Sequence, residues 1–312
     1  MNIALGTMHF GTRVDEQTSY NILDKYVELG GQWIDTANCY AFWGSAGGFG
    51  GQSETTIGRW LASRPDAREH VLLSTKVGAE PKRPGGFPTD VEGLSRRAVL
   101  HAVAGSLERL GVDSVDLLWT HMEDRSTELH ETVDVLGDLV DGGRAARIGW
   151  SNHPVWRVER ARCLAGDRGN SVVTAIQQRW SYLHPRPDAP VEGQDHPFGM
   201  MSTETLDYAS SNPGIELWGY TPLMTGFYHR PGSQLPSSYD HPGTNRRLRA
   251  LQEVADETGA TLGQIVLAWM NSSRPAVRPI VGVSSVEQLE SAAAAAELRL
   301  SQAHMEKLDT AS

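Results

Sequence analysis

Four residues that can donate, accept or stabilise a proton stand just after apolar runs in this sequence. Asp35 and Tyr40 follow one such run, Lys76 ends a second and His121 ends a third. Taken singly, each has an ordinary interpretation as a turn cap, a solvated side chain, a loop aromatic or a structural histidine. They could meet only if the runs are neighbouring parallel strands, because in a barrel the carboxyl ends of such strands lie together.

The chemistry that suits this set is proton donation by a phenol. A tyrosine, with a pKa of about 10, is a weak acid near neutrality. The Lys76 ammonium is expected to stabilise the phenolate of Tyr40 and lower its pKa, while Asp35 pairs with the lysine. His121 could hydrogen-bond a substrate oxygen and orient it. Such a centre protonates a developing alkoxide but supplies no hydride, so it requires a nicotinamide cofactor.

The elements that must position these residues alternate along the chain. Apolar runs predict strands at 3–8, 33–35, 71–76, 115–121, 146–151, 173–178, 216–221 and 278–283. Helical spacing and end signals predict helices at 15–29, from 53, at 92–110, at 127–141, from 154, and at 202–211, 245–258, 261–272 and 285–297. Eight strands joined by helices predict an α/β fold, a (β/α)8 barrel of the TIM-barrel type, with residues 1–312 as a single domain.

Glycine and serine positions refine this prediction. A doubly wound open sheet is the structural alternative, but it would carry GxGxxG after its first strand, and Gly6 and Gly11 do not have that spacing. The glycine-rich stretch 41–51 predicts a long loop beyond the second strand. Ser53 is expected to be the N-cap of the helix that follows this loop.

Composition and charge limit the functional classes. The 312 residues include 39% apolar and 21% charged side chains, and the formal net charge is −10. This acidity argues against a nucleic-acid or anionic-membrane partner. Cys39 and Cys163 provide neither a disulfide framework nor metal-ligand spacing, so we expect no metal and a reducing, cytoplasmic location. There is no secretion signal and no run of about 18 apolar residues, so we expect no membrane span.

Three motifs connect the candidate residues to a known family. They are Asp-Thr-Ala-x-x-Tyr at 35–40, Ser-Thr-Lys-Val-Gly at 74–78 and Gly-x-Ser-Asn at 149–152. In this order and at these positions, the chain resembles an aldo-keto reductase along essentially its full length. The resemblance implies NAD(P)H-dependent reduction of aldehydes or ketones. It also implies a catalytic tetrad of Asp35, Tyr40, Lys76 and His121.

The same resemblance implies where a nicotinamide cofactor binds. Ser151, Asn152 and Gln177 would hold the carboxamide, with Gln177 preferred to Gln178 because a tryptophan then follows at the family spacing. Tyr220 would stack on the ring. The remaining implied contacts line the floor, the pyrophosphate loop and the adenosine phosphate site: Gly6, Thr7, Met8, Asp35, Pro222, Leu223, Thr225, Gly226, Gly282, Ser284 and Gln288.

The choice between NADPH and NADH is less sharply defined. Many family members have an arginine or lysine near Ser284 or Ser285 and an asparagine at the position of Ala292, and this chain has none of these. A serine pair with backbone N–H groups at a helix start can still bind a phosphate, without a bidentate guanidinium. Family habit favours NADPH, and NADH stays an alternative.

Substrate contacts are expected from Trp43 and Trp180, with the loops 41–52, 182–202 and 227–244 shaping specificity. The polar residues in 184–196, namely His184, Arg186, Asp188 and Asp195, suggest a hydroxylated carbonyl such as a keto or aldehyde sugar. His121 disfavours steroid double-bond reduction, because relatives with that reaction carry glutamate there. Cys39, next to Tyr40, is expected to lie within reach of oxidation. The sequence leaves the oligomeric state open.

Two competing functions belong to other classes. A redox-sensing regulatory subunit, like the β subunits of potassium channels that share this fold, would keep the cofactor site and turn over slowly. A barrel aldolase could instead use Lys76 as a Schiff base. The Asp, Tyr and His neighbours of that lysine and the Gly-x-Ser-Asn match favour the reductase.

Overall fold

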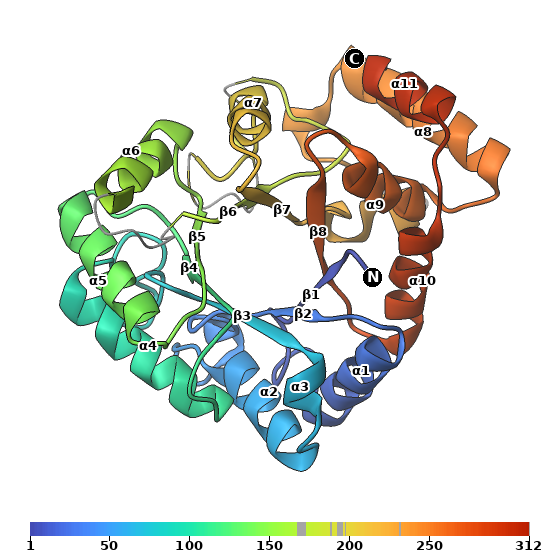
Figure 1. Cartoon of the computed structure of the whole chain (residues 1–312). Coiled ribbons are helices and arrows are strands. Elements are labelled where there is room, and N and C mark those ends of the chain that lie inside the picture. The colour runs from blue at the N-terminus through green and yellow to red at the C-terminus, as the bar shows by residue number, and fades with distance from the viewer. Residues whose placement is uncertain (167–172, 188, 192–195, 197, 231, 312) are drawn as a thin grey trace.

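A computed structural model describes residues 1–166, 173–187, 189–191, 196, 198–230 and 232–311. In these residues eight parallel strands pair in sequence order and close into a barrel. Figure 1 looks along that barrel, with the strands in an inner ring and the helices around it. The predicted (β/α)8 barrel is therefore confirmed. The strands are β1 (Ala4–Gly6), β2 (Trp33–Asp35), β3 (Leu72–Val77), β4 (Leu117–Thr120), β5 (Ile148–Ser151), β6 (Ala175–Arg179), β7 (Glu216–Tyr220) and β8 (Val277–Gly282).

The helices follow the predicted alternation, with two additions that the sequence pattern did not reveal. These additions are α3 (Ala67–His70), which is only four residues long, and the C-terminal helix α11 (Gln302–Thr310). The others are α1 (Glu16–Glu28), α2 (Gln52–Ser63), α4 (Arg96–Leu110), α5 (Leu129–Asp141), α6 (Val155–Gly166), α7 (Thr203–Ser211), α8 (Pro242–Thr258), α9 (Leu262–Ser272) and α10 (Val286–Glu297). Short 3-10 turns occur at η1 (Phe42–Gly44), η2 (Met224–His229) and η3 (Ser237–Tyr239).

The start of α2 differs from the prediction. Ser53 is not its N-cap, because the helix begins at Gln52 after Gly51, whose φ of 104° only glycine adopts easily. The Ser53 side chain points instead into the protein and bonds with Thr7 and Thr36. A serine in the first turn resembles a cap in sequence, but here the glycine before it already provides the turn.

Side chains from alternate strand positions fill the barrel. Trp33, Trp119 and Trp218 form one interior cluster, with Trp218 edge-on to the other two rings at centroid distances of 5.1 and 5.4 Å. Gly149, on β5, makes room for this cluster, since a Cβ there would overlap the Trp119 ring. The glycine of the Gly-x-Ser-Asn motif is thus required by packing.

The amino-terminal end of the barrel is closed by a charged group that sequence reasoning missed. Glu216 pairs with Arg147 at 2.6 Å and lies 3.9 Å from Arg278. The two guanidinium groups lie over the rings of Trp33 and Trp218 respectively. Two cations over aromatic faces, which share one carboxylate, form a polar floor beneath the tryptophans. The candidate catalytic residues lie at the opposite end.

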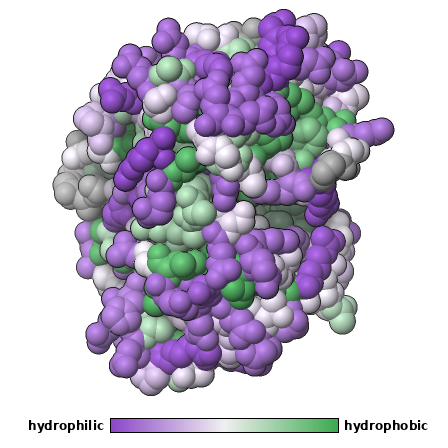
Figure 2. All heavy atoms as spheres, turned by 90° about the vertical axis from the view of Figure 1, so that its right-hand side faces the viewer, coloured by the Kyte–Doolittle hydropathy of each residue, from purple (hydrophilic) through white to green (hydrophobic). Residues whose placement is uncertain are grey.

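Two features of the exterior complete the fold. Figure 2 shows the side that carries α8 to α11, where hydrophilic residues dominate and apolar ones appear as scattered patches. Over the described part of the chain, every helix is too short or too polar to span a membrane.

The Gly149 packing predicts a specific sensitivity. Gly149→Ala places a methyl group against the fully buried Trp119 ring, and such overpacking costs about 1–3 kcal/mol or more. We expect a lower urea midpoint in equilibrium unfolding. Gly166→Ala is the control, because nothing lies within 4 Å of a Cβ at the end of α6. Equal midpoints for the two variants would contradict this account of the barrel interior.

Candidate active site

Strand alternation brings the candidate residues together at the carboxyl end of the barrel. Register pairs Asp35 with Ser74, and Lys76 with Trp119, on successive strands. Positions two residues apart on a strand face the same side. Lys76 therefore points inward like Ser74, and His121, just beyond β4, continues the inward-facing row of Trp119. Ser151 and Gln177 pair in the same way on β5 and β6.

Asp35, Lys76 and Tyr40 form one bonded chain. The Lys76 Nζ donates to Asp35 Oδ2 at 2.5 Å, to the Thr36 carbonyl oxygen at 2.8 Å and to the Tyr40 hydroxyl oxygen at 2.9 Å. Both partners of the ion pair are only 1% exposed. Ser74 donates to the other Asp35 oxygen at 2.7 Å. All three donor directions of the ammonium are therefore used, and one of them is aimed at Tyr40.

Burial sets the protonation states at this end of the barrel. Loss of solvent, with the Asp35 charge second, raises the pKa of Tyr40 well above its usual value. The expectation that Lys76 lowers it is wrong, because the carboxylate next to the lysine offsets its charge and burial disfavours the phenolate. Burial also lowers the pKa of Lys76, against the opposing effect of Asp35. Tyr40 is therefore held as a phenol, the form that can donate a proton.

His121 stands beside Tyr40, with ring centroids 5.7 Å apart in an edge-on arrangement. Burial, and then the charge of Lys76, lower its pKa well below the usual value, so the imidazole is neutral. Its backbone N–H donates to Val77 at 2.8 Å, and Asn152 donates to its carbonyl oxygen at 2.9 Å. A neutral imidazole can donate one hydrogen bond to a substrate oxygen.

The groups expected to hold a nicotinamide carboxamide lie on the far side of Asp35. Gln177 Nε2 is 3.3 Å from Asp35 Oδ1, whereas Gln178 points outward and bonds with backbone oxygens and α7. The Ser151 hydroxyl is buried without a hydrogen-bond partner in the described part of the chain. A buried hydroxyl is normally satisfied, so this arrangement fits a polar ligand group placed between Ser151 and Gln177.

Tyr220 and Asn152 are linked by a contact that sequence reasoning did not find. The Tyr220 hydroxyl donates to Asn152 Oδ1 at 2.9 Å and lies 3.3 Å from the Gly199 carbonyl oxygen. A Cβ on Gly199 would lie 2.9 Å from that Asn152 oxygen and 3.0 Å from the Tyr220 hydroxyl. Only a glycine lets this backbone approach so closely. The sequence offered no signal beyond one glycine in a polar loop.

The floor and one seam of the site have few side chains. Gly6 and Gly282 pair across β1 and β8 and form a glycine seam. A Cβ on Gly6 would lie only 3.0 Å from the Ile280 side chain, so the backbone is closely packed there. Met8 is 42% exposed beside it. Thr7 is buried instead, and its hydroxyl donates to the Asp35 carbonyl oxygen at 3.0 Å. Thr7 thus supports the Asp35 segment from behind.

The segment after β7 has an unusual backbone. Thr221, Met224 and Thr225 have φ values of 55°, 48° and 54°, and Gly226 has 90°. Left-handed conformations at residues other than glycine cost energy and gather at ligand-binding sites. Pro222 and Leu223 lie within this segment. The Arg230 guanidinium lies close to Gly226, within 3.4 Å of where a Cβ would be, and has no hydrogen-bond or ion-pair partner among the described residues.

The predicted adenosine phosphate site lies at the start of α10. Ser285 is the N-cap and accepts from the Gln288 backbone N–H at 3.3 Å. Gln288 accepts from the Ser284 backbone N–H at 2.9 Å through its side-chain oxygen. Ser284 and Gln288 are exposed, while Ala292 is buried. The structure thus brings the two predicted contacts together at an open helix start.

The two predicted substrate contacts have different surroundings. Trp43 is 40% exposed and contacts Phe42, which in turn packs on Phe87. Its ring is also edge-on to His9. Trp180 is only 6% exposed, because it stacks on Trp269 of α9 and meets His184. Trp43 therefore faces open space near Tyr40, and the packing of Trp180 favours a structural role.

Several polar residues of the expected substrate loops also have structural partners. Burial lowers the pKa of His184 to about 4, and its carbonyl oxygen lies 2.9 Å from a His241 ring nitrogen. The Arg186 backbone N–H donates to Ser238. Asp188 and Asp195 lie outside the described residues. The polar sequence in this loop therefore does not by itself define a sugar site.

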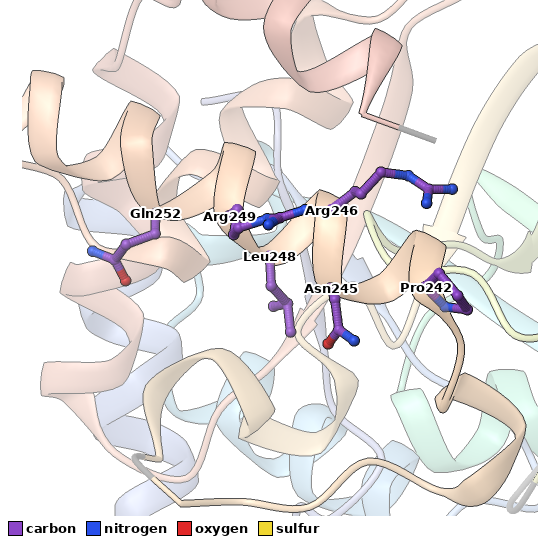
Figure 3. A pocket seen from close by; sticks show the side chains of 6 residues that line it. All are labelled: Pro242, Asn245, Arg246, Leu248, Arg249 and Gln252. Atoms are coloured by element: carbon purple, nitrogen blue, oxygen red, sulfur yellow. The ribbon is translucent and has the colours of Figure 1, made fainter.

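A separate surface hollow lies along α8 (Figure 3), far in sequence from the tetrad. Its lining comes from one helix face: Pro242, Asn245, Arg246, Leu248, Arg249 and Gln252. It holds none of the candidate catalytic or cofactor residues. Among the described residues, no group of three or more His, Cys, Asp or Glu side chains is arranged to hold a metal ion.

A closed (β/α)8 barrel with an acid, a phenol, a lysine and an imidazole at its carboxyl end defines a barrel oxidoreductase site. Comparison with known proteins agrees. The sequence pattern of the aldo/keto reductase family matches residues 2–312, so the chain belongs to that family. It is an NAD(P)H-dependent oxidoreductase, of a family that acts on carbonyl groups.

Individual relatives are distant but cover almost the whole chain. An uncharacterized oxidoreductase of Bacillus subtilis, YrpG, is 30% identical over 96% of this chain and 88% of its own length. Norsolorinic acid reductase of Aspergillus flavus is 29% identical over 99% of this chain and 77% of its own. The crystal structure of the thermostable aldo-keto reductase Tm1743 with the inhibitor epalrestat has a TM-score of 0.74 at 25% identity. It covers 100% of this chain and 95% of that one.

The buried ion pair predicts a strong dependence of stability on both partners. Asp35→Asn leaves the Lys76 ammonium buried without its counter-ion, which costs about 3–5 kcal/mol. The double variant Asp35→Asn with Lys76→Met removes the charge as well, and we expect it to regain most of that loss. Urea unfolding of the wild type, of Asp35→Asn, of Lys76→Met and of the double variant gives the coupling free energy between the two side chains. A simple sum of the two single effects would contradict the buried-pair interpretation.

Proposed function

We propose that this chain reduces an aldehyde or ketone with NADPH, and that Tyr40 is the general acid. The observation that carries the proposal is the Tyr40 hydroxyl, which accepts from the Lys76 ammonium at 2.9 Å and has no acceptor for its own proton among the described residues. That proton is therefore available to a substrate oxygen above it. The raised pKa of Tyr40 keeps the proton in place until negative charge develops on that oxygen.

Each member of the tetrad then has one task. His121 and Tyr40 both donate to the carbonyl oxygen and fix its position. Tyr40 transfers its proton to that oxygen as the alkoxide forms, and Lys76 stabilises the resulting phenolate. Asp35 keeps Lys76 charged and in place. A bound nicotinamide supplies the hydride. Proton exchange with solvent returns Tyr40 to the phenol.

The same inference assigns the cofactor contacts. Ser151, Asn152 and Gln177 hold the carboxamide, and Tyr220 stacks on the ring while its hydroxyl is tied to Asn152. Gly6, Met8 and Gly282 border the glycine seam, and Thr7 supports it from behind. The segment Pro222–Gly226, in which Met224, Thr225 and Gly226 are left-handed, covers the pyrophosphate. Ser284 and Gln288 face the adenosine phosphate. Arg230, whose guanidinium has no partner within the described part of the chain, supplies a positive charge close to the pyrophosphate segment.

The aromatic wall beside Tyr40 supports a substrate with a flat apolar part. Phe42 and Trp43 continue from Tyr40, Phe87 packs on Phe42 at 5.1 Å, and Phe49 is 41% exposed. One of the relatives named above is a norsolorinic acid reductase. A ketone or aldehyde attached to an aromatic ring therefore fits this wall better than the keto sugar suggested by the polar loop.

The alternatives receive less support. Lys76 is 1% exposed, paired with Asp35, and uses all three of its donor directions, so a Schiff base there would require the whole pair to break. None of the relatives named above is a channel subunit, and we do not propose that role. We retain one barrel domain over residues 1–312 and a cytoplasmic location as proposals from the sequence.

Removing one oxygen atom tests the role of Tyr40. Tyr40→Phe keeps the ring but loses the proton donor, so we expect kcat to fall by roughly 10²–10⁴ while the Kd for NADPH changes little. Turnover is followed by NADPH absorbance with a panel of aryl ketones, aryl aldehydes and keto sugars. Tyr20→Phe, a half-buried tyrosine on α1, is the control. Retained turnover in Tyr40→Phe would refute the assignment.

Arg230 gives a test of cofactor binding that needs no substrate. Arg230→Leu removes a charge-assisted contact worth about 1.5–3 kcal/mol, so we expect the Kd of NADPH to rise at least ~10-fold. Arg249→Leu, in the hollow on α8, is the matched control. Titration of protein fluorescence with NADPH and with NADH distinguishes the two phosphate sites. Equal losses of affinity for both cofactors locate Arg230 at the pyrophosphate. A loss of affinity for NADPH alone locates it at the 2′-phosphate. Unchanged affinity for both cofactors excludes Arg230.

A further inference from the structure

Cys39 contacts the ring of His121, and the proposed reaction gives the thiol no task. Its Sγ lies 3.4 Å from His121 Nδ1, and the residue is 2% exposed. This is the only hydrogen bond of the thiol among the described residues. The other imidazole nitrogen, Nε2, has no partner there. The thiol therefore contacts Nδ1 of the imidazole ring, and Nε2 is left for a ligand in the site.

The surroundings keep both groups uncharged. Burial, with Glu80 and Glu92 adding to it, raises the pKa of the Cys39 thiol well above its usual value. Burial and the nearby Lys76 lower the pKa of His121. A thiolate–imidazolium pair is therefore disfavoured on both sides. Cys39 is also a poor target for oxidation, which needs an accessible thiolate, so the expectation from sequence that it lies within reach of oxidants is wrong.

A neutral imidazole carries one proton, and its partners decide which nitrogen holds it. Between Cys39 and His121, the thiol is the more acidic donor and the imidazole nitrogen is the better acceptor, because sulfur accepts weakly. The favoured arrangement is therefore Sγ–H donating to Nδ1. That leaves the ring proton on Nε2.

We propose that Cys39 is a positioning residue that fixes His121 as the Nε2–H tautomer, with this N–H directed at the substrate oxygen. Other contacts of His121 cannot do this: Val77 and Asn152 hold its backbone, and Tyr40 meets the ring only by an edge. Without the thiol, Nδ1 could keep the proton and Nε2 would face a carbonyl oxygen with a lone pair. The functional half of this inference rests on the proposed reductase activity, whereas the tautomer does not.

Two substitutions of nearly equal size separate the hydrogen bond from the packing. Cys39→Ser keeps a donor facing Nδ1, and Cys39→Ala removes it. Both lose the volume of sulfur, so a purely structural role predicts similar effects. Cys163→Ala removes the other thiol, which is exposed on α6. Thermal unfolding and the Kd for NADPH show whether each variant remains folded and able to bind cofactor.

The first measurement is the ¹⁵N spectrum of the histidine rings, with His121 assigned by its loss in His121→Gln. We expect the Nε2–H tautomer in the wild type, in Cys39→Ser and in Cys163→Ala, and a mixture or the Nδ1–H tautomer in Cys39→Ala. An Nδ1–H tautomer in the wild type overturns the proposal. So does a spectrum of Cys39→Ala that matches the wild type.

The second measurement is steady-state reduction of the best carbonyl in the panel. In Cys39→Ala we expect kcat/KM to fall about tenfold with an unchanged Kd for NADPH, and in Cys39→Ser to recover most of the loss. Equal losses in the two variants, or none in Cys39→Ala, refute the link between Cys39 and catalysis. If the wild type reduces no carbonyl, the proposed function fails, and the nitrogen spectrum still decides the tautomer.

Discussion

The structure at the carboxyl end of the barrel depends on a buried ion pair between Lys76 and Asp35. Charges so far from water are stable only when each is paired and its remaining hydrogen bonds are filled. Here the Thr36 carbonyl oxygen and the Tyr40 hydroxyl oxygen accept the other two hydrogen bonds of the ammonium, and Ser74 donates to the carboxylate. The tyrosine hydroxyl is thus one of the groups that make the buried cation possible. Its position is fixed before any ligand arrives.

This pair constrains the backbone around it. Asp35 ends β2, and the loop after it must return Tyr40 to the lysine on β3. Thr7 and Ser53 support that loop through bonds behind Asp35. The polar groups behind the loop are as necessary as those facing the substrate, because each would otherwise be a buried unpaired donor or acceptor.

Sequence patterns predicted the barrel, and they predicted that Asp35, Tyr40, Lys76 and His121 meet at the carboxyl ends of its strands. Both predictions rest on local signals, namely strand alternation and the strand-end motifs. Such signals failed where a residue's role depends on a distant partner. Ser53 resembles a helix cap in sequence, but its hydroxyl bonds with Thr7 and Thr36, which are far away in the chain. The substrate contact predicted for Trp180 stays a prediction, but its stacking partner Trp269 lies on a helix about 90 residues later and gave no local signal. Gly199 gave no signal, since its closeness to Tyr220 appears only after β6 and β7 are assembled.

The pKa of Tyr40 shows the same limit in electrostatic form. Reasoning from residue types alone places a cation beside a phenol and predicts a lowered pKa. The folded structure adds burial and the Asp35 charge, and both raise the pKa of Tyr40. The outcome is a site in which Lys76 and Asp35 form a buried ion pair, while Tyr40, His121 and Cys39 are neutral hydrogen-bonding groups. In such surroundings the better acceptor decides the direction of a hydrogen bond, and a thiol that donates to one nitrogen of an imidazole leaves the ring proton on the other nitrogen.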